Sequence, residues 1–381
     1  MPAYRAGKAQ ELDRIADWLQ SELAALKAAR PEHGVILGYL NTEFEKVERE
    51  LGLFAAILDD PALERRAHVL LQGITRYVVT TTSHYLAGLR RQSAEDQQFR
   101  HVLLGIARRL RLDWIEDLMA CLYRELGVVA KYRDLPCIPV FYGPPHLLET
   151  IFELTGVYHE FGHSVSAKHR QFGGELMTTI HRHFKEVKDR PGPLTPEQKE
   201  TRDKAIDQFR ERWTEAVISE IFCDVFGAYA CGTAYFALMV DLGISRGRDP
   251  YLQTSSTYPP TCARVSASWH ALLPEQQNCA TAQKIHEGWQ RYTQCFPATQ
   301  RYRIGFSEEL VGNLATQVLT LLQAHLPDTP RYCKCLPSVV EAQAIAKGVA
   351  LEDLVNSGVS ILFDAPQEFA AWQQSARLLI A

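Results

Sequence analysis

The sequence predicts a mainly α protein of the α+β class, with helical regions on both sides of a core that holds a short strand. Three observations lead to this fold class. Apolar residues recur at three- and four-residue steps through most of residues 10–126, a short apolar run at 138–142 is bounded by prolines and a glycine, and a long apolar run follows Trp213. Three- and four-residue spacing places side chains on one helix face, whereas a short bounded apolar run is typical of a strand.

The N-terminal region, residues 1–130, is expected to be helical throughout. Leu12, Ile15, Leu19, Leu23 and Leu26 begin the pattern, and amphipathic runs follow at 47–58, 62–91 and 96–126, separated by Pro31 and the turn Asp59-Asp60-Pro61. Proline and aspartate at these points are typical of breaks between helices. Two interpretations stay open for this region. It is either a partner-binding, regulatory domain or a helical layer that packs against the core.

The core, residues 131–290, begins where the helical periodicity gives way to a segment rich in proline and apolar residues. The run Ile138–Tyr142 predicts a short strand at the exposed edge of a small sheet, because prolines flank it. Pro144 and Pro145 favour the first turn of a helix, which we expect from near Leu147 to about His169. Gly162 lies in the middle of that helix and leaves room for a facing helix or a ligand backbone.

The charged segment 181–212 predicts a solvated loop and helix inserted into the core, and a lid or recognition element is the alternative. The apolar run 216–240 is long enough to raise the question of a membrane span. It contains two carboxylates, Glu220 and Asp224, which would be costly in lipid, so we expect a buried helix and no membrane. The C-terminal region, residues 291–381, predicts further helices, with an irregular connection at 325–337 and a closing pair of helices.

The motif HEFGH, residues 159–163, carries the strongest functional signal. Two histidines four residues apart lie on one face of a helix, so both imidazoles can reach one ion. Glu160 follows the first histidine, where a carboxylate can act as general base on a water at the open position of a zinc site. The motif therefore predicts a hydrolytic zinc site that includes His159 and His163.

Glu220 and Asp224 supply a second pair, again four residues apart, and are the only charges between Glu215 and Asp241. Buried carboxylates need a partner. Glu220 would complete a His2Glu ligand set with water in the fourth place, and Asp224 would accept the outer N–H of a ligand histidine. A pair of surface acids that meet lysine or arginine is the alternative.

HEFGH followed by a Glu-x-x-x-Asp helix resembles the gluzincin metallopeptidases. The run SEIFCDVFGAYACGTAYF, residues 219–236, is similar to the corresponding helix of bacterial members, and TYPPTCARV, residues 257–265, resembles the third motif of HtpX-like peptidases. The resemblance covers about residues 138–271. It implies a helical zincin-like catalytic core, a Zn²⁺ cofactor and an edge strand that pairs with a peptide or protein substrate. Tyr258 stands where those families usually carry a histidine that stabilises the tetrahedral intermediate, and a phenol can also donate to an oxyanion.

Composition narrows the remaining classes of function. A formal net charge of −4 argues against nucleic acid as a ligand. The first 20 residues contain no apolar segment typical of a secretory signal, and together with nine cysteines they predict reduced thiols in a cytoplasmic protein.

Cys223 and Cys262 are expected to be small buried apolar residues. The alternative is a thiolate that caps the zinc and keeps the enzyme latent. His181 with His183, and Cys333 with Cys335, lack companions at ligand spacing.

The sequence thus predicts a zinc-dependent metallopeptidase in which His159, His163 and Glu220 hold the metal and Glu160 moves the proton. Tyr258, Arg264 or His270 would face the oxyanion, with the first two preferred because they lie in the third motif. Arg264 would alternatively anchor its segment through a carboxylate near Asp224. Three other hypotheses stay open: a catalytically silent metal-binding module, a latent peptidase released by a regulatory protein partner, and a helical scaffold in which HEFGH is coincidental.

Overall fold

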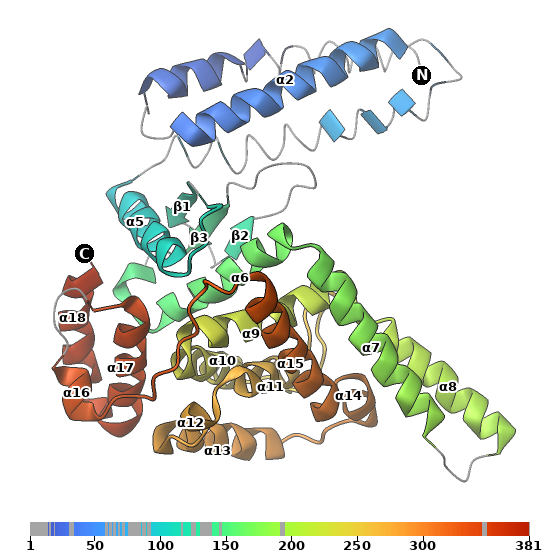
Figure 1. The fold of residues 1–381 in the computed structure, drawn as a ribbon, viewed down its shortest axis with the longest axis vertical. Helices are drawn as coiled ribbons and strands as arrows, with labels where there is room; N and C mark the ends of the chain where they lie inside the picture. Colours follow the sequence, from blue (N-terminus) through green and yellow to red (C-terminus); the bar gives the residue numbers. More distant parts are fainter. Residues whose placement is uncertain are drawn as a thin grey trace. The chain divides into compact units, whose positions relative to one another are not determined.

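The computed structural model describes residues 139–144, 147–190, 195–344 and 349–380. Before residue 139 it describes 20–29, 34–57, 93–115, 117–122 and 127–129, together with single positions and pairs between residues 14 and 89. The described chain is mainly helical, as the sequence predicts. It divides into two units (Figure 1). Unit 1 contains residues 1–104, 114–121 and 138–141, and unit 2 contains residues 105–113, 122–137 and 142–381.

The long helix of unit 1 is α2 (Gly34–Ile57). Its buried side chains form one stripe at three- and four-residue spacing, made of Ile36, Leu37, Leu40, Phe44, Val47, Leu51 and Phe54. The amphipathic run expected at 47–58 is therefore the second half of a longer helix. Residues 20–29 are also helical, with Leu23 and Leu26 buried. The expected helical positions Leu12, Ile15 and Leu19, the breaks at 31, 59 and 61, and most of the run 62–91 lie outside the described residues.

Three short strands follow α5 (Ala94–Arg109): β1 (Met119–Leu122), β2 (Gly127–Val129) and β3 (Val140–Gly143), in the order β1-β3-β2. Two predictions are wrong here. The helix expected over 96–126 ends at Arg109, and the expected edge strand, β3, is the middle strand of the sheet. The four residues of β1 are all buried, and periodicity cannot distinguish so short an apolar run from a helix segment.

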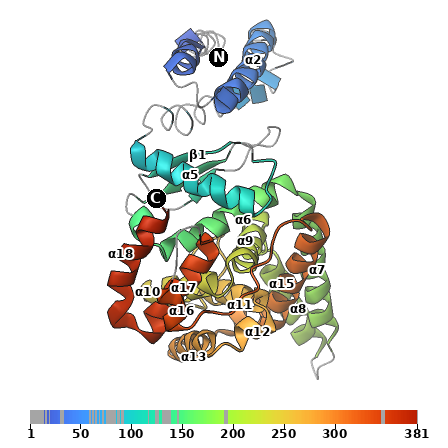
Figure 2. The same cartoon turned by 60° about the vertical axis from the view of Figure 1, so that its left-hand side comes forward.

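Unit 2 holds the remaining helices, which Figures 1 and 2 show from two sides. They are α6 (Gly156–Lys168), α7 (Gln171–Asp189), α8 (Pro196–Arg210), α9 (Glu215–Cys231), α10 (Thr233–Ser245), α11 (Thr261–Ala271), α12 (Pro274–Gln277), α13 (Ala280–Gln294), α14 (Gln300–Gly305), α15 (Glu308–His325), α16 (Val339–Gln343), α17 (Leu351–Asp364) and α18 (Phe369–Ile380). Three short 3-10 helices are η4 (Leu147–Glu149), η5 (Glu153–Thr155) and η6 (Pro366–Glu368). The helical C-terminal region, its irregular connection and the closing pair α17 and α18 are confirmed.

The HEFGH helix, α6, starts later than the sequence suggests. We expected it from near Leu147, but η4 and η5 precede it and the α-helix begins at Gly156. The Thr155 hydroxyl donates to the carbonyl of Phe152 at 2.6 Å, a bond across a tight three-residue turn. The C-terminal boundary, Lys168, agrees with the expected one.

The charged segment forms the paired helices α7 and α8, which lie side by side in Figures 1 and 2. The expected loop after His181 is helix as far as Asp189. α8 begins with a capping box, in which the Thr195 side chain accepts from the backbone N–H of Gln198.

The long apolar run breaks into α9 and α10 at Gly232, whose φ of 67° is accessible mainly to glycine. The side-chain amide of Asn356 on α17 holds this break. Its oxygen accepts from the backbone N–H of Ala234 at 3.0 Å, and its nitrogen donates to the carbonyl of Cys231 at 2.8 Å. In the part of the chain that the structure describes, no helix has the length and apolar character needed to cross a bilayer. Helices α6, α10 and α11 all pack on α9.

Candidate metal centre

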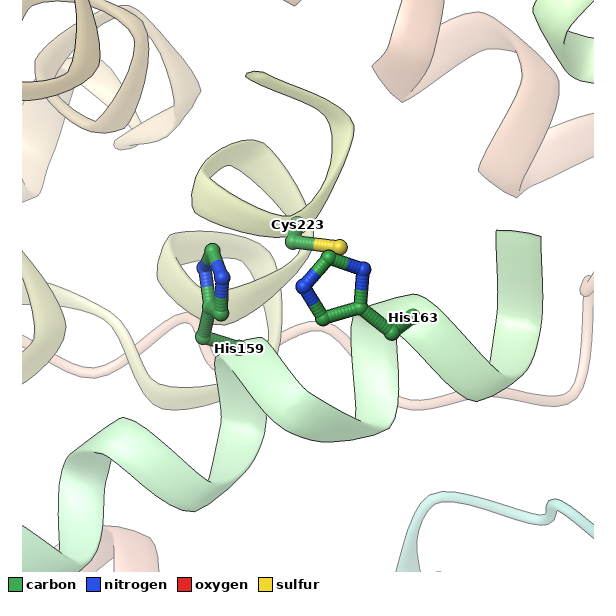
Figure 3. Close-up of side chains that lie close together, drawn as sticks. All are labelled: His159, His163 and Cys223. Atoms are coloured by element: carbon green, nitrogen blue, oxygen red, sulfur yellow. The ribbon is translucent and has the colours of Figure 1, made fainter. Parts of the chain in front are cut away.

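Helix α6 presents both histidines of the HEFGH motif on the face that packs against α9 (Figure 3). The rings of His159 and His163 have centroids 4.9 Å apart and stand at 87° to each other. His159 is 8% exposed, and the side chain of His163 keeps 24% of its surface accessible. The local geometry of the helix, with residues four apart on one face, is what brings the two rings together.

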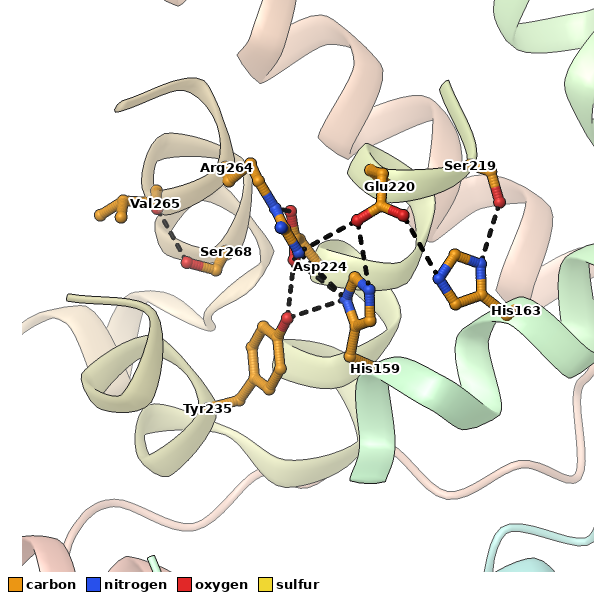
Figure 4. Close-up of polar contacts among 9 residues, drawn as sticks. All are labelled: His159, His163, Ser219, Glu220, Asp224, Tyr235, Arg264, Val265 and Ser268. Atoms are coloured by element: carbon orange, nitrogen blue, oxygen red, sulfur yellow. Dashed lines mark hydrogen bonds and ion pairs between the residues drawn. The ribbon is translucent and has the colours of Figure 1, made fainter. Parts of the chain in front are cut away.

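Glu220 of α9 lies opposite the two histidines and contacts both (Figure 4). One carboxylate oxygen, Oε2, lies 3.4 Å from Nε2 of His159, and the other, Oε1, lies 3.4 Å from Nε2 of His163. Glu220 is 8% exposed, and its buried Oε2 accepts no hydrogen bond. A buried carboxylate oxygen without a hydrogen bond is costly unless a cation reaches it, and the Arg264 guanidinium lies 3.3 Å from Oε2.

The outer nitrogens of both rings are held by other side chains. Nδ1 of His159 lies 3.1 Å from Oδ1 of Asp224, and Nδ1 of His163 lies 3.2 Å from the hydroxyl of Ser219. A proton held on Nδ1 by these outward contacts would leave the lone pair of each Nε2 for a metal. This is the arrangement of a histidine prepared to bind a metal.

Asp224 is completely buried and is neutralised by Arg264 of α11. The guanidinium binds both carboxylate oxygens, Nε to Oδ2 at 2.7 Å and a terminal nitrogen to Oδ1 at 2.8 Å. Burial alone would raise the pKa of Asp224, but the charge and hydrogen bonds of Arg264, with help from His159, hold that pKa below its ordinary value. Asp224 is therefore ionised and fixed in place. Arg264 also lies 3.3 Å from Oε2 of Glu220.

His159 and Glu220 carry opposite charges at this site. Burial lowers the pKa of His159, but the hydrogen bonds to Asp224 and Glu220 outweigh burial and raise that pKa to about 9. Burial raises the pKa of Glu220, while its contacts with His159 and His163 lower it by more, so Glu220 is ionised. The proton on His159 thus adds a second positive charge, beside that of Arg264, to the two carboxylates Glu220 and Asp224.

Glu160 is buried, with 8% of its surface exposed, and no described residue forms a hydrogen bond or ion pair with its carboxylate. The negative charge of Glu220, burial and, to a smaller extent, the charge of Glu160 raise the pKa of Tyr258. Tyr258 is half-exposed and its ring lies 5.9 Å from the guanidinium carbon of Arg264. His270, the other expected oxyanion donor, instead binds Glu308 at 2.7 Å.

The spacing of the donor atoms fits a zinc ion. In a tetrahedral site with bonds of about 2.0–2.1 Å to histidine and carboxylate, neighbouring donors are roughly 3.3–3.4 Å apart. Both contacts of Glu220 with the histidines are 3.4 Å. The outward contacts of the two Nδ1 atoms also leave the Nε2 atoms on the side of Glu220. His159, His163 and Glu220 therefore supply the donor types of a His2Glu site, with one Glu220 oxygen beside each Nε2.

Cys223 offers a different third donor, because its sulfur and one nitrogen of each of His159 and His163 lie within 4.8 Å of one another (Figure 3). We favour Glu220 over this thiol for two reasons. Glu220 contacts both Nε2 atoms at 3.4 Å. Burial raises the pKa of the Cys223 thiol well above its usual range, so Cys223 is a neutral apolar group in the metal-free site.

The other candidates from the sequence lie elsewhere. His183 is buried and contacts the hydroxyl of Ser307 at 3.4 Å, and His181 is exposed. Within the described ranges, neither these histidines nor the exposed Cys333 and Cys335 belong to a group of three metal donors.

Sequence reasoning missed two residues at the centre, Ser219 and Tyr235. The Tyr235 hydroxyl donates to Oδ1 of Asp224 at 2.6 Å. Ser219 directly precedes Glu220, but adjacency alone does not give its direction. Tyr235 lies beyond the helix break, so no local spacing could have placed it at the site.

Comparison of the chain with protein families, with curated proteins and with solved structures finds no match.

Proposed function

We propose that this protein is a zinc-dependent metallopeptidase that hydrolyses peptide bonds. The observation that carries the proposal is the placement of Glu220, whose two carboxylate oxygens lie 3.4 Å from the Nε2 atoms of His159 and His163. Two histidines and a carboxylate leave one position of a tetrahedral ion open, which is typical of catalytic rather than structural zinc sites.

The side chains at the proposed site have two roles, metal binding and orientation of the metal-binding histidines. His159, His163 and Glu220 would hold the ion, and Asp224 and Ser219 would keep the histidine rings in place through their Nδ1 atoms. Bound zinc would lower the pKa of a water molecule toward 7 and polarise the scissile carbonyl.

Glu160 has a carboxylate without any hydrogen bond or ion pair among the described residues, so its oxygens are free to act. In the proposed reaction, it takes a proton from the attacking water and gives it to the amine that leaves. Tyr258, which is half-exposed beside Arg264, would donate its hydroxyl proton in a hydrogen bond to the carbonyl oxygen as negative charge develops there.

Arg264 is engaged by both oxygens of Asp224. Its charge reaches the site through that carboxylate and through Glu220, 3.3 Å away. We therefore assign it to holding Asp224 and not to direct contact with the carbonyl oxygen.

The first experiment measures metal content and hydrolysis together. We expect stoichiometric zinc by mass spectrometry in the wild-type protein and in Glu160→Gln, and loss of zinc in Glu220→Ala. Hydrolysis of an unstructured protein substrate should occur in the wild type and be lost in Glu160→Gln, because the glutamine amide cannot accept the proton. Glu175→Gln, on the exposed face of α7, is the matched control and should keep both zinc and activity. Full hydrolysis by Glu160→Gln would refute the assignment of the base.

A catalytically silent or latent form of the same centre is the second candidate. The burial of the site favours it, since His159, Glu160 and Glu220 are each 8% exposed. A latent enzyme would contain zinc and show no hydrolysis until a partner or proteolysis opens the site. Limited proteolysis followed by the same assay separates the two, because a silent protein stays inactive after opening.

A further inference from the structure

Tyr235 is the one aromatic side chain that contacts both Asp224 and His159 among the described residues (Figure 4). Its hydroxyl oxygen lies 2.6 Å from Oδ1 of Asp224 and 3.1 Å from Nδ1 of His159. The rings of Tyr235 and His159 are nearly parallel, with 6° between their planes. Tyr235 is 1% exposed, so water does not compete for these contacts.

The hydrogen-bonding capacity of a phenol decides how these three groups share protons. The hydroxyl has a single proton, and the shortest contact, to the carboxylate of Asp224, takes it. The phenol oxygen is then an acceptor facing Nδ1 of His159. Asp224 is also an acceptor for that nitrogen. Both acceptors lie closer to Nδ1 than the Arg264 guanidinium, which is 3.4 Å away, so they favour a proton on Nδ1 and would leave the lone pair of Nε2 for a metal.

The fold brings Tyr235 to this place through two glycines. A β-carbon on Gly227 would lie 2.6 Å from the Tyr235 ring, so only glycine gives the ring room against α9. Gly232 turns the chain between α9 and α10, and Asn356 holds that turn by bonds to the backbone on both of its sides. The turn at Gly232 and the close approach at Gly227 therefore set the position of the Tyr235 ring, and with it the position of the hydroxyl.

We propose that Tyr235 is a positioning residue for the metal ligand His159, acting as a second acceptor at Nδ1 beside Asp224. The proposal rests on the zinc centre of the proposed function and adds a residue that sets its affinity. Residues that orient metal-bound histidines in this way typically change metal affinity by about 10–100-fold when they are removed.

The test compares Tyr235→Phe with Tyr229→Phe. The control loses a buried hydroxyl of the same kind, which donates to the carbonyl of Thr329 at 3.0 Å and contacts neither histidine. Zinc affinity is measured by competition with a chromophoric chelator at fixed pH. We expect a loss of about 10–100-fold in Tyr235→Phe and a change of less than about threefold in Tyr229→Phe.

Three results overturn the inference. Unchanged zinc affinity in Tyr235→Phe refutes the role of Tyr235 but leaves the zinc centre intact. An equal loss in both variants shows a general structural effect. A wild-type protein that takes up no zinc removes the proposed function together with the inference.

A measurement on the wild-type protein covers the case in which Tyr235→Phe does not fold. Nuclear magnetic resonance of histidine labelled with nitrogen-15 reports which ring nitrogen carries the proton. For zinc-loaded protein, we expect a slowly exchanging proton on Nδ1 of His159. A rapidly exchanging Nδ1 proton would mean that the buried acceptors do not hold it, and the inference would be wrong.

Discussion

Gly162 of helix α6 lies directly against Cys223 of helix α9. A β-carbon added to Gly162 would lie 2.8 Å from the Cα of Cys223 and 3.1 Å from its sulfur, closer than nonbonded atoms pack. This contact sets the distance between the helix that carries the histidines and the helix that carries Glu220. The geometry of the candidate zinc site therefore depends on the absence of a side chain at residue 162.

Gly162→Ala should destabilise the protein by about 1–3 kcal/mol, because the extra methyl group forces the two helices apart. Urea denaturation of the purified variant measures the free energy of unfolding. Gly105→Ala is the matched control, since Gly105 lies within α5 and a β-carbon there would meet nothing within 4 Å. That change should be neutral or stabilise by up to about 1 kcal/mol. Equal effects in both variants would contradict the packing argument.

Arg264→Met should destabilise the protein by about 3–5 kcal/mol, because it leaves the buried carboxylate of Asp224 without its counter-charge. The Arg264 side chain is 14% exposed and that of Asp224 is fully buried. The control is Arg190→Met, which breaks a pair with Glu309 whose side chains are 58% and 53% exposed. The control should change stability by less than about 1 kcal/mol in the same urea experiment. A small effect at Arg264 would argue that it is not the anchor of Asp224.

Zinc affinity should rise with pH because zinc and a proton compete for His159. In the metal-free protein the pKa of His159 is about 9, so binding displaces one proton at neutral pH. We expect the apparent affinity to increase about tenfold per pH unit between pH 6.5 and 8.5. Isothermal titration calorimetry in buffers of different ionisation enthalpy counts the protons released. If the zinc affinity did not change with pH, His159 would not carry a proton that zinc displaces.

The same shift predicts how the metal-free protein responds to pH. An unfolded histidine has a pKa of about 6.5, so protonation of folded His159 stabilises the metal-free protein fully below about pH 6.5. This contribution is lost as the pH rises toward 9. Thermal unfolding of the chelator-treated protein should therefore move to lower temperature over that range. Zinc-loaded protein should not show this loss.

Cys223→Ala should retain stoichiometric zinc, because in the proposed site the Glu220 carboxylate, and not the thiol, completes the ligand set. Cobalt substitution gives a direct check, since a cysteine ligand produces a strong thiolate-to-cobalt absorption in the near ultraviolet. The cobalt-loaded wild-type protein should lack this band. Its presence, and its disappearance in Cys223→Ala, would replace the His2Glu set with one that includes the thiol.

Local spacing in the sequence determined the faces of the two helices that carry the site. The four-residue steps from His159 to His163 and from Glu220 to Asp224 fix these side chains in pairs, because an α-helix repeats every 3.6 residues. The mainly helical character and the closing pair α17 and α18 follow from the same periodicity. Short elements were less predictable, since the four-residue strands β1 and β3 contain too few residues to show a period or a place in a sheet.

Only the tertiary structure decided how those pairs face each other. Gly162 sets the separation of the helices, and Arg264 was found to bind Asp224, a choice that the sequence left open. Tyr235 reaches the site because Gly232 reverses the chain and Asn356, more than a hundred residues later, holds the turn. Helical spacing reports only neighbours within a few residues, whereas these contacts join segments that are distant in sequence and depend on the packing of α9 against its surrounding helices.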